Sequence, residues 1–138
     1  MTNKQLPDWK ILKCECIRLR LDGLEVFNIL SDEAIEKTFN YIGPDRMPEK
    51  IRIYLSKIFD CVLPAVLIHD CRFVIGGTIR DFHSANTELR KNLVKCLRAN
   101  RKDFTLVGYW LARIKIQIAY LLCEKYGKEG WKFKNETV

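Results

Sequence analysis

The chain has 138 residues, of which 48% are hydrophobic, and it carries a formal net charge of +7. This length allows one hydrophobic core and is short for two, so we expect a single domain over residues 1–138. No internal repeat or low-complexity segment is visible, and the positive charge indicates an anionic partner. The opening MTNKQLPDWK lacks the basic region and apolar run of a signal peptide, so we expect a cytoplasmic protein.

The first part of the chain predicts a hairpin followed by two helices. Residues 11–28 alternate polar and apolar positions around Asp22-Gly23, a dipeptide preferred in two-residue hairpin turns, and predict an N-terminal β-hairpin. Serine and acidic residues then open a predicted helix over 31–42, which a Gly-Pro pair ends. Another helix is expected over 48–59, where apolar residues follow helical spacing.

The next segment, PAVLIHDCRF from Pro64 to Phe73, places an imidazole beside a carboxylate in an otherwise apolar stretch. Buried ionisable groups are costly unless they are paired, ligated or used, so His69-Asp70 needs an explanation. One explanation is a hydrogen-bonded pair in a packed helix. The other is a catalytic or metal-binding dyad, and residue type alone leaves both open.

Helix signals place this dyad on the first of two neighbouring helices. One helix is predicted over 60–75 and ends at Gly76-Gly77, because glycine adopts the left-handed conformation at least cost. Ser84 is expected to cap a second helix that continues to Leu97. The short connection favours antiparallel packing, so the fold class is mainly α, with an antiparallel helix pair at its core and the short hairpin before it.

The same spacing predicts which side chains meet between the two helices. His69 and Phe73 lie one turn apart on one face of the first helix, and Asp70 lies at its flank. Asn86 stands near the start of the second helix, which is opposite the end of the first. We therefore expect His69 and Asn86 within hydrogen-bond reach, directly or through one water.

The pattern P-A-x-x-x-H-D-x-x-F, followed by a helix bearing A-N-x-x-L-x-x-x-L, resembles the core of the phospholipase A2 superfamily. The resemblance is especially to its small prokaryotic members, in which the motif reads P-A-C-x-x-H-D-x-x-Y and the second helix has an Asp at the Asn86 position. Small phage and prophage proteins of unknown function carry a related A-x-x-x-H-D-x-x-Y and A-D pattern, and the chain resembles them at least as closely. The match covers roughly Asp60 to Leu97, about a quarter of the chain.

The resemblance implies a role for each matched residue. His69 would be the general base that activates a water for hydrolysis of a phospholipid ester. Asp70 would hold Ca²⁺ together with backbone oxygens around Asp60–Leu63. Phe73 replaces the Tyr of the family, and Asn86 replaces the Asp that orients the imidazole.

These two replacements leave two classes of function open. An Asn oxygen still accepts a hydrogen bond, but it carries no charge to stabilise an imidazolium, and the equivalent change in a serine-protease triad costs roughly 10⁴ in rate. One class is therefore a phospholipase A2-type carboxylic ester hydrolase weakened by Asn86 and Phe73. The other is a noncatalytic phage or bacterial interaction or structural protein that keeps the fold.

The six cysteines form no paired C-x-x-C arrangement of the kind that binds zinc. Secreted bacterial members of the family link the two helices through a Cys at the Val66 position, and here Val66 leaves Cys96 without that partner. We therefore expect free thiols in a reducing cytosol.

The most apolar segment, FTLVGYWLARIKIQIAYLLC, is long enough to suggest a membrane span. Charged residues interrupt it near its centre, which is expensive in hydrocarbon, so we expect a core helix that covers the two motif helices and no transmembrane segment. Its predicted core stripe is Val107, Trp110, Leu111, Ile114, Ile118, Leu121 and Leu122. The residues after Tyr126 lack periodicity and are expected to run along the surface.

Basic residues are concentrated on and just after the second motif helix. They are Arg90, Lys91, Lys95, Arg98, Arg101 and Lys102. A solvated helix face, an anionic phospholipid surface and a nucleic acid are the three explanations that charge alone allows. No helix-turn-helix, RNP or zinc-finger pattern is evident, so sequence-specific nucleic-acid binding is not expected.

Overall fold

The computed structural model describes residues 8–40 and 58–134. These two ranges are mainly helical, as expected, and they contain no β-strand beyond one isolated bridge between Gly77 and Phe133. The predicted helix over 48–59 lies almost entirely outside the described residues, as does the Gly-Pro end of the helix before it. The helices in chain order are α1 (Trp9–Arg18), α2 (Val26–Ile29), α3 (Asp32–Asn40), α5 (Phe59–Ile75), α6 (Ile79–Ala99), η1 (Arg101–Asp103), α7 (Leu106–Tyr126) and η2 (Gly127–Gly130).

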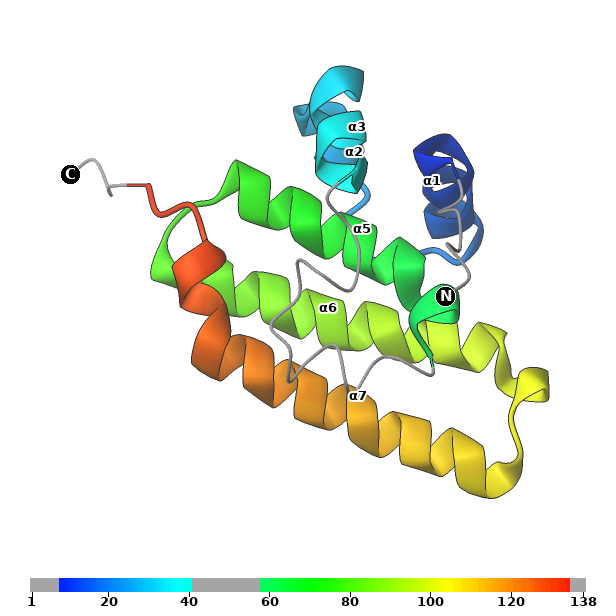
Figure 1. Cartoon of the computed structure of the whole chain (residues 1–138). Helices are drawn as coiled ribbons and strands as arrows, with labels where there is room; N and C mark the ends of the chain where they lie inside the picture. Colours follow the sequence, from blue (N-terminus) through cyan, green and yellow to red (C-terminus); the bar gives the residue numbers. More distant parts are fainter. Residues whose placement is uncertain (1–7, 41–57, 135–138) are drawn as a thin grey trace.

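Three long helices form the body of the molecule (Figure 1). α6 lies between α5 and α7, while α1 and α3 pack against α5. α5 is therefore covered on two sides, and its side chains from Val62 to Ile68 are buried all round the helix. A helix that is apolar on every face must be packed against neighbours on more than one side. The hydrophobic residues of α5 are not confined to one face, which agrees with this packing.

The connection between α5 and α6 is tight and well capped. α5 ends where the sequence predicts, and Gly76 follows it with a φ of 70°. Thr78 then caps α6, because its hydroxyl accepts from the Asp81 amide at 3.2 Å while Asp81 Oδ2 accepts from the Thr78 amide at 2.9 Å. This capping box starts α6 earlier than the predicted cap, Ser84, which lies exposed within the helix.

α7 packs along α6 through a face that contains small side chains. The residues buried on this face are Tyr109, Ala112, Ile116, Ala119 and Cys123. The stripe predicted as its core face was wrong, since Val107, Trp110, Leu111, Ile114 and Leu121 are 53–69% exposed. Both sides of α7 are apolar, so periodicity does not choose between them, and the two alanines allow the closer approach to α6.

The N-terminal segment is helical, and the predicted β-hairpin over 11–28 is wrong. Asp8 caps α1, because its Oδ1 accepts from the Lys10 amide at 2.9 Å. The buried residues of α1 recur at helical spacing, and they are Trp9, Leu12 and Cys16. Tertiary burial of that face therefore overrode the local alternation of polar and apolar residues.

Asp22-Gly23 forms the turn between α1 and α2 rather than a hairpin turn. The Asp22 amide donates to Asn92 Oδ1 at 2.8 Å, and Asn92 Nδ2 donates to the Asp22 carbonyl at 2.8 Å. Lys95 Nζ donates to the Arg20 carbonyl at 2.9 Å. Side chains of α6, rather than a second strand, therefore satisfy the backbone of this turn.

The segment after α7 turns back onto the α5–α6 connection. The Gly77 amide donates to the Lys132 carbonyl at 3.0 Å, and the Lys134 amide donates to the Gly77 carbonyl at 3.0 Å. Trp131 Nε1 also donates to the Gly77 carbonyl, at 3.2 Å, and the side chain is only 5% exposed. The expected surface course of this segment is therefore wrong at Trp131, which belongs to the interior.

The six cysteines are free thiols, as expected. Four of them are buried, and burial raises the pKa of each of these thiols to about 12. They are Cys16, Cys71, Cys96 and Cys123. At neutral pH these side chains are neutral and pack as small hydrophobic groups.

Candidate functional site

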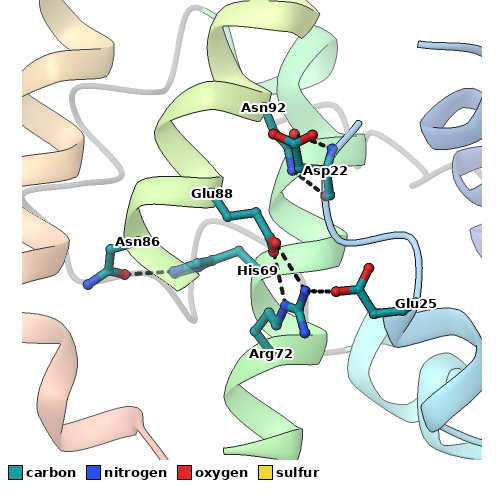
Figure 2. A network of polar contacts seen from close by, with 7 residues as sticks. All are labelled: Asp22, Glu25, His69, Arg72, Asn86, Glu88 and Asn92. Atoms are coloured by element: carbon teal, nitrogen blue, oxygen red, sulfur yellow. Dashed lines mark hydrogen bonds and ion pairs between the residues drawn. The ribbon is translucent and has the colours of Figure 1, made fainter. Parts of the chain in front are cut away.

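The structure brings His69 and Asn86 together across the interface of α5 and α6 (Figure 2). His69 Nε2 lies 2.9 Å from Asn86 Oδ1. Asn86 is fully buried, while His69 is partly exposed. The predicted contact between the two residues is confirmed, and it is direct.

This hydrogen bond fixes the protonation of the imidazole. Because an amide oxygen only accepts, His69 Nε2 must carry the proton, and Nδ1 of the neutral ring holds the lone pair. Burial lowers the pKa of His69 from 6.5 to about 4, and the hydrogen bond to Asn86 opposes this shift only in part. His69 is therefore a neutral base at pH 7.

The amide of Asn86 is only half satisfied. Its Nδ2 is buried and has no hydrogen-bond partner within residues 8–40 and 58–134. A buried donor without a partner costs about 1–3 kcal/mol. An aspartate at this position would remove the unpaired N–H group, but its second oxygen would lie at the same buried position and would need a donor of its own.

An aromatic wall covers one side of the imidazole. The ring of Phe73 lies 4.7 Å from that of His69 between centroids, as expected for residues one turn apart. Trp131 packs edge-on against Phe73 at 5.1 Å, and Phe82 packs against Trp131 at 5.6 Å. Phe73 shields one side of the imidazole and so contributes to the desolvation that lowers the His69 pKa.

A salt bridge one turn from His69 clamps α5 to α6. Arg72 Nε and Nη2 each lie 3.0 Å from one oxygen of Glu88, which makes the contact bidentate. Arg72 Nη2 also binds Glu25, in the residues just before α2. The Arg72 and Glu88 side chains are only 21% and 17% exposed, so this pair holds the two helices in register beside the His69–Asn86 contact.

The predicted calcium site does not fit the described residues. Asp70 follows His69 on α5, but the backbone oxygens expected to join it, those of residues 60–63, lie seven to ten positions earlier on the same helix. At about 1.5 Å per residue they are roughly 10–15 Å away along the axis, too far to share an ion that needs bonds of about 2.3–2.6 Å. In the part of the chain that the structure describes, no group of three His, Cys, Asp or Glu side chains is arranged to hold a metal.

Sequence reasoning missed several residues that build this site. Arg72 lies one turn after His69, but Glu88 follows Asn86 by only two positions, and residues two apart do not share a helix face, so spacing alone did not predict this ion pair. The helix predicted to begin at Ser84 does not include Phe82, so the sequence did not predict that Phe82 is part of α6. No sequence pattern near Trp131 predicted that its side chain packs against Phe73.

Comparisons with family models, with curated proteins and with solved structures gave no match to this chain. The resemblance to the phospholipase A2 superfamily is therefore carried by the motif residues, and the activity that it implies is a proposal.

Proposed function

We propose that this chain is a phospholipase A2-like protein with a site for ester hydrolysis built on His69 and Asn86. The 2.9 Å hydrogen bond between their side chains carries the proposal, because these are the residues that the P-A-x-x-x-H-D and A-N patterns pair. The substrate class is a phospholipid ester.

In this proposal His69 acts as the general base. The bond from Nε2 to Asn86 orients the ring and fixes its tautomer, and Nδ1 accepts a proton from water as the water oxygen attacks the ester carbonyl carbon. When the tetrahedral intermediate collapses, the bond to the leaving alcohol breaks and the alcohol takes the proton from Nδ1. The products are a fatty acid and a lysophospholipid.

The proposed activity is slow for two physical reasons. A base with a pKa of about 4 has little driving force to remove a proton from water at neutral pH. Asn86 orients the imidazole but cannot stabilise its positive charge, a deficit that costs roughly 10⁴ in a serine-protease triad.

A noncatalytic interaction or structural protein is the second candidate. The same low pKa of His69 favours it, because a neutral imidazole packed against Phe73 also serves as a hydrogen-bonded contact between two helices. In this account the basic surface of α6 binds the partner and His69 has no chemical role.

Release of fatty acid from phosphatidylglycerol vesicles, measured by mass spectrometry, distinguishes the candidates. The proposal predicts release by the wild type above that of His69→Gln, whereas His83→Gln, which removes the exposed histidine, should match the wild type. Equal release by the wild type and His69→Gln, with and without calcium, would leave the noncatalytic account. A rise in melting temperature with calcium that Asp70→Asn abolishes would test the calcium role that the resemblance implies.

A further inference from the structure

A groove with a basic rim lies between α6 and α7. Its volume is about 550 Å³, and Asp22 is the acidic residue among those that line it. Val94 and Ile116 supply apolar walls, and Trp110 and Ile114 lie at its α7 side. Its cationic residues are Arg90, Lys91, Lys95, Arg98 and Arg113.

Within residues 8–40 and 58–134, acidic side chains neutralise only a small part of this positive charge. Lys95 pairs with Asp22, with 3.1 Å between Nζ and Oδ1. The ion pairs formed within the described ranges include none of the other four cations of the groove. Arg113 lies over the ring of Trp110, 5.7 Å from its centroid, which positions the guanidinium while leaving its N–H groups available for an anion.

Exposed apolar side chains border the groove on the face of α7 that points away from α6. We call this set the outer stripe, and its residues, each more than half exposed, are Leu106, Val107, Trp110, Leu111, Ile114 and Leu121. Trp110 and Ile114 belong both to the outer stripe and to the groove. Exposed large apolar side chains gathered on one helix face are typical of an interaction site, and beside the cations of the groove they favour a partner that is both anionic and apolar.

We propose that the groove and the outer stripe form a docking surface for an anionic phospholipid membrane. The four cations that form no ion pair within the described ranges bind lipid phosphates, and α7 lies in the plane of the interface with the outer stripe among the first acyl carbons. Arg113 and Lys115 lie on either side of the stripe, where their stems can lie along lipid while their charges reach the headgroups. The inference deepens the proposed function by naming the face that meets phospholipid, but its test measures binding alone.

Other occupants fit the surface less well. A nucleic acid would bind the cations but would leave the aliphatic part of the outer stripe in water. A second copy of the chain packed on the stripe would bring two sets of these cations together. The segment Leu106–Gly130 reaches a mean hydropathy of 1.3 and is apolar and long enough to cross a membrane, but α7 packs against α6 along one side and carries Arg113 and Lys115 near its middle.

Trp110 allows a direct optical test. The chain has three tryptophans, and the other two, Trp9 and Trp131, are only 7% and 5% exposed. The His69→Gln protein, chosen so that hydrolysis does not alter the lipid, is titrated with phosphatidylglycerol–phosphatidylcholine vesicles and with pure phosphatidylcholine vesicles. We expect a blue shift of tryptophan emission with the first and none with the second, and Trp110→Phe should remove the shift.

A charge-matched pair of variants tests the groove. Arg98→Gln combined with Arg113→Gln should weaken partitioning onto the anionic vesicles by roughly 30-fold, the effect expected for two cations at a charged surface. Lys10→Gln combined with Lys37→Gln removes the same charge from α1 and α3, and should change it by no more than about twofold. Unchanged circular dichroism melting confirms that both variants fold.

Three results would overturn the inference. The first is equal binding to neutral and anionic vesicles, and the second is equal weakening of vesicle binding by the two double variants. The third is a protein that does not bind vesicles but binds duplex DNA, and that loses DNA binding when Arg98 and Arg113 are both replaced. A dimer that Trp110→Phe dissociates in the absence of lipid would assign the outer stripe to a second copy instead. Hydrolysis that fails while vesicle binding persists would reject only the catalytic proposal.

Discussion

Replacing His69 by Gln should remove a specific part of the acid sensitivity of the fold. The pKa of His69 falls from 6.5 to about 4 on folding, because the ring is desolvated between α5, α6 and the aromatic wall. Above pH 6.5 the ring is neutral in both states and costs nothing. As the pH falls from 6.5 toward 4, the unfolded chain binds a proton that the folded protein excludes, so stability is lost.

The magnitude follows from the shift. One pKa unit corresponds to 1.36 kcal/mol, so the wild type should lose about 3 kcal/mol through this group between pH 7 and pH 4. Gln keeps an N–H group to donate to Asn86 and does not titrate. Urea unfolding of both proteins across this pH range, with the difference between their free energies of unfolding plotted against pH, isolates the contribution of His69 from that of the carboxylates.

The control is His83→Gln, which removes the other histidine of the chain, an exposed one whose Nδ1 lies 2.5 Å from Glu124 Oε2; the loss of stability assigned to His69 should persist in this variant. If the wild type and His69→Gln lose stability in parallel as the pH falls, His69 is not desolvated and the account of the site is wrong.

Two further substitutions test the supports of the site by urea unfolding. Glu88→Gln should cost about 2 kcal/mol, because Arg72 then loses its bidentate partner at a partly buried position, whereas Glu15→Gln, which breaks an exposed pair on α1, should cost less than about 0.5 kcal/mol. Gly76→Ala should cost at least about 2 kcal/mol, since φ is 70° and a Cβ atom would lie 2.0 Å from a backbone oxygen of the C-terminal segment. Gly130→Ala, with its nearest neighbour at 3.6 Å, should be nearly neutral.

The helix pair and its central contact could be predicted because their signals are local. Glycine ends α5, the connection is short, and the spacing of His69 and Asn86 from that connection places them opposite each other. The start of α6 was misplaced because two capping residues compete, and the capping box at Thr78 is the one closer to the turn.

The remaining features depend on contacts between distant parts of the chain. Asn92 holds the Asp22 turn across a separation of 70 residues, and nothing near Asp22 distinguishes that role from a hairpin turn. The buried face of α7 was decided by the fit of two alanines against α6, since apolar side chains occur on both of its sides. Trp131 joins the aromatic wall from a segment without periodicity.

The rate at which Asn86→Asp releases fatty acid from phosphatidylglycerol vesicles tests the central claim most directly. The new carboxylate places a negative charge beside His69 and raises the pKa of the imidazole, so the account predicts a rate at least about tenfold above the wild type, with His69→Gln in the same background abolishing it. A folded Asn86→Asp protein in which the His69 pKa rises, as followed by NMR, while release stays at the wild-type level would contradict the claim that this pair is a hydrolytic site.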